Sequence, residues 1–339
     1  MSSETQSPAP ELPLPFRKRV ERRLSDLLLP SLLFPLRQMP WGLARTTGRG
    51  LGFLLFTFLK RYRVVALKNL TLVYGKERSV SEIRQMAKAV FRHFGQMATE
   101  FIKLPTLNKE TVDRLITVEG EENLRESVAM GKGTLIITGH FGNWEMMGRW
   151  FSTHDYLLNV VARDARARSA TKFLEETRTG SGAKVLYRGS SARAILQCIK
   201  KNELVAILPD QNAADVFVPF FGFPTGTVDG PAVIHLRTQA PLVFSWCIRE
   251  PDNRFRIVFE PPVIVPNTGD RTADIETVMA LINARLEARI RQNPTQWLWL
   301  HNRWKASPGV FPEGEEEARI LNMTSSEYLA EMQQKREQK

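Results

Sequence analysis

One stretch decides how the rest of this chain is interpreted. It is Gly133-Thr-Leu-Ile-Ile-Thr-Gly-His140-Phe-Gly-Asn143-Trp-Glu145. Positions 134–138 form a short apolar and β-branched run between two glycines, which is typical of a buried strand in a parallel or mixed sheet. Asn143 can cap a helix that continues through Glu145. We therefore expect His140 in the loop between the end of a strand and the start of a helix. This loop leaves the carboxyl edge of a sheet, where the active and binding sites of α/β proteins usually form.

At this place His140 can act as a general base, provided that a partner holds one imidazole nitrogen in the N–H form. Glu145 lies in the first turn of the predicted helix, and its carboxylate can fold back to be that partner. Unpaired N–H groups of the same turn could stabilise an oxyanion. A histidine beside phenylalanine and tryptophan can equally be a packed core residue, so the spacing alone leaves both interpretations open.

Three motifs, taken in order, resemble those of the lipid A biosynthesis (lauroyl/myristoyl) acyltransferases, a branch of the lysophospholipid acyltransferase superfamily. They are Gly139-His-Phe-Gly-Asn-Trp-Glu145, Pro209-Asp-Gln211 and the closing Trp299-Leu-His-Asn-Arg-Trp-Lys305. The resemblance implies that His140 and Glu145 form a catalytic dyad for O-acyl transfer. It also implies an acyl thioester donor, with acyl carrier protein as the partner, and a hydroxyl of a lipid A precursor or related glycolipid as the acceptor. No metal or bound cofactor is implied, and the expected location is the cytoplasmic face of the cell inner membrane.

Strands alternate with helices between residues 116 and 208, which predicts an α/β fold. The expected strands are 116–119, 134–138, 157–161, 184–186 and 203–208, and the expected helices are 121–130, 143–151, 169–180 and 190–201. Residues 242–248 and 254–260 are expected to pair as antiparallel strands, before an amphipathic helix over 272–292. Together these elements predict an αβα sandwich with a central mixed sheet, preceded by N-terminal membrane-associating helices.

Arginines follow the predicted strand 157–161. Several guanidinium groups at the carboxyl end of a strand would suit the phosphates of a lipid acceptor, because each can form two parallel hydrogen bonds. Arg163 aligns with an arginine that the family uses near its active site, so the resemblance makes it a substrate-binding candidate. Arg166 is a second candidate, although a solvated helix start explains it equally well.

Further polar residues are candidates for substrate binding. Asp210 ends a buried strand and falls at the same sheet edge as His140 if the two strands are parallel, although it could instead close an Asx turn. Asn143 joins these candidates. In the closing motif, strand-like alternation puts His301 and Arg303 on one face with two tryptophans, so we expect this polar pair to continue toward a pocket rim.

Four phenylalanines lie within residues 217–223, more than a loop usually carries. They could wall a groove for an acyl chain. Packing onto the sheet explains them nearly as well, so both interpretations are kept.

The formal net charge of +11 is concentrated near the start of the chain, where residues 1–70 hold 12 Lys and Arg against 4 Asp and Glu. The apolar runs 27–36 and 51–59 lie in this part, and both are shorter than the ~18–20 residues that span a bilayer. We expect amphipathic helices in the membrane interface, with arginines toward lipid phosphates. A helical cap folded onto the core is the alternative, and both can hold at once.

The expected organisation has four parts. They are a disordered lead over residues 1–16, a helical membrane-associating region over 17–104, an acyltransferase core over 105–312 and a charged tail over 313–339.

Two rival functions come from other classes. A metal-dependent hydrolase would use His140, Glu145, Asp210 and His301 as ligands, but the sequence lacks a clustered His-x3-His or Cys pair. A non-enzymatic basic protein that binds membranes or nucleic acid would explain the charge, but it leaves the histidine turn without a role. We therefore expect a membrane surface as a partner, and no nucleic acid.

Overall fold

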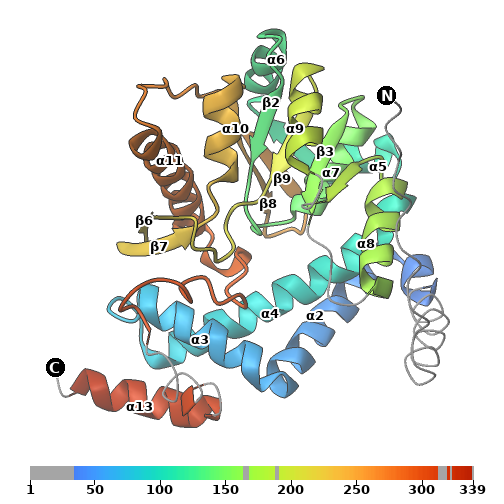
Figure 1. Cartoon of the computed structure of the whole chain (residues 1–339). Coiled ribbons are helices and arrows are strands. Elements are labelled where there is room, and N and C mark those ends of the chain that lie inside the picture. Colours follow the sequence, from blue (N-terminus) through green and yellow to red (C-terminus); the bar gives the residue numbers. More distant parts are fainter. Residues whose placement is uncertain (1–33, 163–167, 188–190, 312–318, 321–322, 338–339) are drawn as a thin grey trace, which may run out of the picture.

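The computed structural model describes residues 34–162, 168–187, 191–311, 319–320 and 323–337. Within these residues a seven-stranded mixed sheet forms the centre, in the order β1-β9-β8-β2-β5-β3-β4 (Figure 1). Its strands are β1 (Ile116–Glu119), β2 (Thr134–Ile137), β3 (Leu158–Ala162), β4 (Lys184–Tyr187), β5 (Leu204–Ile207), β8 (Leu242–Arg249) and β9 (Phe255–Phe259). The strands from β8 to β4 run parallel, and β9 is antiparallel to β8. The predicted α/β fold with a mixed sheet is confirmed.

Helices cover both faces of this sheet. One face packs against α6 (Glu121–Ala129), α7 (Trp144–Thr153) and α8 (Arg168–Gly180), and the other against α9 (Ser191–Lys200), α10 (Gly230–Thr238) and α11 (Arg271–Gln292). Side chains of β2 alternate between the two cores, with Ile136 in the first and Leu135 and Ile137 in the second. Burial on both sides explains why the predicted strand is an apolar run without polar alternation.

A separate two-stranded hairpin, β6 (Val216–Phe220) and β7 (Phe223–Thr227), packs beside α11. Its aromatic residues meet the tryptophans of the closing motif: the ring of Phe220 lies 5.6 Å from Trp297 and 5.7 Å from Trp304. Phe217 points outward and is exposed. Of the two interpretations of the phenylalanine-rich stretch, the contacts therefore favour packing.

The closing motif follows the short 3-10 helix η2 (Pro294–Gln296) and is a series of turns. The strand-like alternation predicted for residues 297–303 is wrong. One antiparallel bridge joins Trp297 to Phe141, and Trp299 N and Arg303 N bond within the motif itself, to the carbonyls two residues earlier. The local bonds keep the backbone turning, so the segment is not a strand, although the rings of Trp297 and Trp299 still lie 4.7 Å apart.

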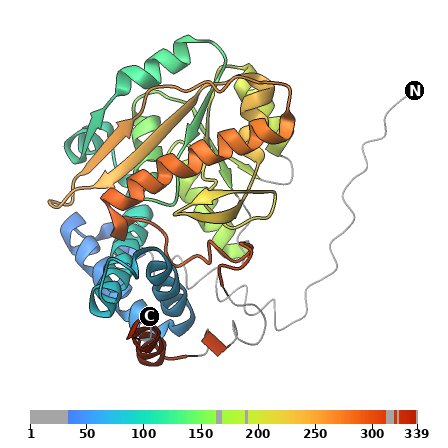
Figure 2. The same cartoon turned by 90° about the vertical axis from the view of Figure 1, so that its left-hand side faces the viewer.

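Three long N-terminal helices form a layer below the sheet, α2 (Trp41–Phe58), α3 (Lys60–Tyr74) and α4 (Val80–Lys103) (Figures 1 and 2). The backbones of α2 and α4 approach so closely that a Cβ added to Gly52 would lie 2.2 Å from the carbonyl oxygen of Phe91. One added to Gly95 would lie 2.3 Å from that of Gly48. Glycine is therefore required on both helices at this crossing.

The same layer reaches the carboxyl edge of the sheet. His93 on α4 bonds through Nε2 to the carbonyl oxygen of Gly142, 3.0 Å away. The Asn69 amide on α3 donates to the carbonyl oxygens of Trp299 and His301, at 2.9 and 2.8 Å. The remaining short elements are η1 (Leu104–Thr106) and α5 (Lys109–Leu115), which lead into β1, and α13 (Ser325–Glu337), which packs on α3.

The outer face of α2 is apolar. Its exposed side chains include Leu51, Phe53, Leu54, Leu55 and Phe58, the last with 76% of its surface accessible. The predicted helix over the run 51–59 is thus confirmed for residues 51–58, whereas most of the run 27–36 lies outside the described residues. None of the helices that the structure describes has the length and apolar character needed to traverse a bilayer.

Candidate active site

His140 and Asp210 meet at the carboxyl edge of the sheet. Because β2 and β5 are neighbouring parallel strands, the loops that follow them lie side by side. The backbone N–H of His140 donates to Oδ2 of Asp210 at 2.7 Å, and the imidazole Nδ1 lies 2.7 Å from Oδ1. The carboxylate thus contacts both the main chain and the ring of the histidine.

Asp210 is buried, and a third hydrogen bond reaches it from Nε1 of Trp297 at 2.9 Å. Burial by itself raises the pKa of this carboxyl, but His140 and the donated hydrogen bonds outweigh that effect and lower the pKa of Asp210 to about 2. An ionised carboxylate only accepts, so the hydrogen of neutral His140 belongs on Nδ1. In that tautomer Nε2 carries no hydrogen and can accept one.

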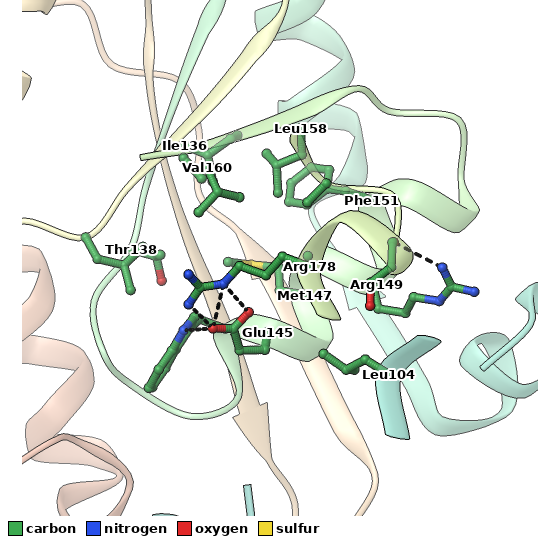
Figure 3. A pocket seen from close by; sticks show the side chains of 16 residues that line it. Leu104, Ile136, Thr138, Glu145, Met147, Arg149, Phe151, Leu158, Val160 and Arg178 are labelled. Atoms are coloured by element: carbon green, nitrogen blue, oxygen red, sulfur yellow. Dashed lines mark hydrogen bonds and ion pairs between the residues drawn. The ribbon is translucent and has the colours of Figure 1, made fainter. Parts of the chain in front are cut away.

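Glu145 has other partners. It lies at the start of α7, where Nε of Arg178 on α8 is 3.2 and 3.1 Å from its two oxygens and Nε1 of Trp144 is 3.0 Å from one of them (Figure 3). The predicted contact between Glu145 and His140 is absent from the described hydrogen bonds, because Nδ1 is taken by Asp210. Glu145 still lies close by, since the ring of its neighbour Trp144 is 4.9 Å from that of His140.

The backbone N–H groups of the turn 140–143 are all engaged. Besides His140, the amides of Phe141, Gly142 and Asn143 donate to the carbonyl oxygens of Gly139, Gln296 and Cys247 at 2.7, 2.8 and 2.8 Å. These four amides are therefore unavailable to an oxyanion. A hydrogen-bond donor for the negative charge of an oxyanion has to come from other residues.

A cavity of about 680 Å³ opens beside His140, and we call it the outer cavity. Its walls are mostly apolar side chains of β3, α9 and α10, and its polar members are His140, Arg178, Gln211, Asp215, Asp229 and Arg271. The side-chain nitrogen of Gln211 lies 3.5 Å from Nε2 of His140. The size and lining are those of a site for a small molecule or a lipid chain.

A second cavity of about 30 Å³, the inner cavity, is lined in part by the ion pair of Glu145 and Arg178 (Figure 3). Its walls are mostly apolar, and Trp144, Val160, Arg178 and Leu208 line both cavities. Within it, the buried hydroxyl of Thr138 has no hydrogen-bond partner among the described residues. The inner cavity is therefore next to the outer one, and Arg178 of the ion pair lies in the wall of both.

Several predicted substrate-binding residues lie away from the outer cavity. Asn143 is fully buried and caps α7 as expected, because its Oδ1 accepts from Met146 N at 3.0 Å. His301 accepts from Asn212 N through Nε2, at 2.9 Å. The buried guanidinium of Arg303 donates to Thr227 Oγ1 at 2.7 Å and to the Gly226 carbonyl, and burial lowers its pKa to about 10. The predicted residues Arg163 and Arg166 lie outside the described residues.

Sequence reasoning missed two features of this site. Asp210 was expected to bind substrate, yet it contacts His140 directly. Arg178 was not a candidate, because it lies near the end of a helix, 33 residues from Glu145, with no motif around it. The Pro-Asp-Gln turn did carry a signal for Asp210, but the sequence does not say that β5 is the neighbour of β2.

The ligand set of the metal-dependent hydrolase does not assemble in the described part of the chain. No group of three or more His, Cys, Asp or Glu side chains there is placed to hold a metal ion. His140 and Asp210 touch each other, whereas Glu145 binds Arg178 and His301 accepts from Asn212.

A histidine ring held by a buried carboxylate, next to a large and mostly apolar cavity, is an arrangement suited to activating a hydroxyl group beside a hydrophobic substrate. Residues 17–306 match the family model for bacterial lipid A biosynthesis acyltransferases. The chain belongs to this family and is an acyltransferase.

Named relatives agree with this family. The chain is 27% identical to the lipid A biosynthesis lauroyltransferase of Escherichia coli (strain K12), over 81% of this chain and 89% of the relative. It is 26% identical to the lipid A biosynthesis palmitoleoyltransferase of the same strain, over 80% and 88%. It is 25% identical to a phosphatidylinositol mannoside acyltransferase of Mycobacterium tuberculosis (strain CDC 1551 / Oshkosh), over 64% and 70%.

Proposed function

We propose that this enzyme moves a fatty acyl group from an acyl thioester to a hydroxyl of a lipid A precursor or related glycolipid. Nε2 of His140 takes the proton of the acceptor hydroxyl while the oxygen attacks the thioester carbonyl. The tetrahedral intermediate collapses to an ester and a thiolate, which recovers the proton from the imidazolium. The observation that carries the proposal is the His140–Asp210 pair at the edge of the outer cavity.

The acceptor class is supported by what the relatives have in common. Lipid A and phosphatidylinositol mannoside, which their names give as the molecules acylated or built, are both glycolipids. Acyl carrier protein is the proposed thioester donor. This acidic protein suits a chain with a net charge of +11, because opposite charges speed the encounter.

Two carboxylates serve this site in different ways. Asp210 fixes the tautomer of His140 and stabilises the imidazolium that forms. Glu145 holds Arg178, whose guanidinium lines both cavities and can meet negative charge on the substrate or the intermediate. Glu145 therefore belongs to the catalytic group together with His140, and it acts through the arginine.

The acyl chain occupies the outer cavity, whose apolar walls are formed by residues such as Val160, Ile195 and Val233. The inner cavity takes the far end of a longer chain once the Glu145–Arg178 pair moves aside. Its apolar lining suits a terminal methyl group, which needs no hydrogen bond.

The same proposal puts the enzyme on the cytoplasmic face of the cell inner membrane. The apolar face of α2 would enter the interface, and the exposed arginines Arg49, Arg61, Arg84 and Arg92 near it would meet lipid phosphates. Arg92 lies over the ring of Phe53, 5.5 Å from its centroid, so charged and apolar groups are adjacent.

The test is acyl transfer by the purified protein. An acyl carrier protein loaded with a fatty acyl group and an under-acylated lipid A precursor are mixed with the enzyme, and the lipid is analysed by mass spectrometry. Wild type should add the mass of one acyl group. His140→Ala should lower the rate by roughly 10²–10⁴-fold while its circular dichroism stays native. A His140→Ala variant with wild-type turnover would refute the assignment.

A further inference from the structure

We propose that Glu100 is a positioning residue for the catalytic turn, acting through Asn143 and Arg249 to hold His140 and Asp210 in register. This inference rests on the acyl transfer proposed above. Glu100 lies on α4, in the N-terminal layer, and does not line either cavity.

Glu100 is completely buried, and both of its oxygens are occupied. Arg249, at the end of β8, binds it through two hydrogen bonds of 2.7 and 2.6 Å. Nε of Arg45 on α2 donates to Oε1 at 2.8 Å, and the amide of Asn143 donates to Oε2 at 2.8 Å. Burial raises the pKa of Glu100, but the two arginines overcome this effect and keep the net shift downward, so the group is charged.

The first connection to the catalytic turn runs through Asn143. Because its Nδ2 is held by Glu100, its Oδ1 is aimed at Met146 N, which it caps. The main-chain N–H of Asn143 donates to Cys247, and the preceding carbonyl of Gly142 bonds to His93. The side chain and main-chain N–H of Asn143, three residues after His140, and the preceding carbonyl are thus all held by hydrogen bonds.

The second connection runs through Arg249. Its main-chain N–H and carbonyl bond to the side-chain amide of Gln296 at 2.9 and 2.8 Å. The carbonyl of Gln296 accepts from Gly142 N, and the next residue, Trp297, donates to Asp210. Glu100 is therefore linked by hydrogen bonds to the segments that hold both members of the His140–Asp210 pair.

A role in stability alone does not explain this cluster. A buried carboxylate with two guanidinium groups has a large desolvation cost, and apolar residues of similar volume often stabilise a fold as well or better. Apolar residues do not fix the relative orientation of the segments they join, because apolar packing is not directional. Four charge-assisted bonds of Glu100, those from Arg45, Asn143 and Arg249, fix the relative positions of α2, α4, α7 and β8 at the point where the catalytic turn ends and α7 begins.

The experiment reverses the hydrogen bond between residues 100 and 143. Glu100→Gln removes the carboxylate, and Asn143→Asp adds a second one while keeping a good helix cap. In the double variant, the glutamine amide can donate to the aspartate, so one carboxylate and one amide face each other again with their positions exchanged. Each single variant should lower kcat on the order of 10–100-fold, with KM for the acyl donor nearly unchanged. The double variant should recover most of that loss.

A matched control lies at the opposite edge of the sheet. The buried amide of Asn159, in β3, donates to the Glu203 carboxylate at 2.9 Å, next to the start of β5. Glu203→Gln and Asn159→Asp make the same chemical changes there. They should lower the unfolding temperature without lowering kcat per folded molecule.

Two further readouts separate positioning from stability. The ratio of acyl transfer to thioester hydrolysis should fall in the single variants, because water needs less exact placement than the acceptor hydroxyl. Hydrogen exchange of peptides covering residues 139–151 should speed up in the single variants and return toward wild type in the double variant. Neither change is expected in the control pair.

The outcomes are distinct. Wild-type kcat in folded Glu100→Gln, or a folded double variant no faster than the slower single variant, would overturn the positioning role. Wild type that transfers no acyl group at all would refute the proposed function instead. The hydrogen-exchange result would then still decide whether Glu100 holds the turn.

Discussion

His140 Nδ1 lies 2.7 Å from a carboxylate oxygen of Asp210, a residue 70 positions further along the chain. The pair exists because β2 and β5 are adjacent parallel strands whose loops leave the sheet at the same edge. Asp210 also accepts from the backbone of His140 and from Trp297, so the ring and the carboxylate share one fixed geometry.

Replacing Asp210 with asparagine should damage catalysis much more than folding. The amide keeps the volume, but it carries no charge to stabilise the imidazolium and can present a donor to Nδ1, which favours the wrong tautomer. We expect kcat to fall by roughly 10²–10⁴-fold with a native circular dichroism spectrum. Full activity in Asp210→Asn would mean that another group orients His140, with Glu145 as the first candidate.

Glu145 and Arg178 should behave as one unit in a double-mutant cycle. If Glu145 acts by holding Arg178, its removal matters little once the arginine is gone. Glu145→Gln combined with Arg178→Met should therefore transfer acyl groups no more slowly than Arg178→Met alone. Losses in kcat that multiply in the double variant would indicate that Glu145 works on His140 directly.

The pH dependence of stability should carry a signature of His93. Burial, with help from Arg249, lowers the pKa of His93 to about 3, whereas an unfolded histidine has a pKa of about 6.5. The unfolded chain therefore binds more protons between these values, and stability rises with pH in that window. His93→Gln, which keeps a donor for the Gly142 carbonyl, should flatten the slope by up to about 1.4 kcal/mol per pH unit.

Urea unfolding at several pH values between 5 and 7 measures this slope. Asp210 adds no slope in that range, because its folded pKa of about 2 and its unfolded pKa of about 3.9 both lie below it. Identical slopes in wild type and His93→Gln would show that His93 takes up its proton without unfolding.

Filling the inner cavity should shorten the acyl chain that is transferred. Gly148 lines this cavity from α7, and a Cβ built on it has no heavy atom within 4 Å. The Cβ of a leucine there meets no atom, its longer side chain extends into the cavity, and the residue should favour the helix by up to about 1 kcal/mol over glycine. With a mixture of acyl donors of graded length, Gly148→Leu should discriminate against the longest chains and leave the rate with the shortest unchanged. An unaltered product distribution would argue that the chain ends elsewhere.

Membrane binding should depend on the apolar face of α2. Leu54→Asp combined with Phe58→Asp puts two charges on this face, where both wild-type side chains are exposed and add little to the core. We expect the binding constant for vesicles that contain anionic lipid to fall by more than about a hundredfold, because burial of two apolar side chains contributes roughly 1.5–3 kcal/mol each. Phe217→Asp is the control, since it changes an exposed aromatic residue on β6. Equal losses in both variants would mean that α2 has no special role.

The sequence was informative wherever a pattern is local. Residues 116–119 form β1 as predicted, and the strands 242–248 and 254–260 pair as expected within about a residue at each end. The period of apolar residues also located α11. These features depend on neighbours along the chain, so a single sequence contains the information.

The parts that were missed depend on contacts between distant segments. That β5 lies between β2 and β3 is a matter of sheet order, and without it Asp210 had no visible connection to His140. The direction of Glu145 was decided by Arg178, on a helix with no motif. The closing motif alternates like a strand, but its local turns and the aromatic packing around Trp297 and Trp304 set its backbone instead.

The glycine crossing of α2 and α4 restricts how these two helices can move relative to each other. Two helices in backbone contact, pinned further by Arg45 and Glu100, cannot roll past each other. The side of α2 that faces outward is thus set at one angle to the turn that carries His140. A lipid layer resting on that side would therefore hold the turn that carries His140 at one fixed orientation to its surface.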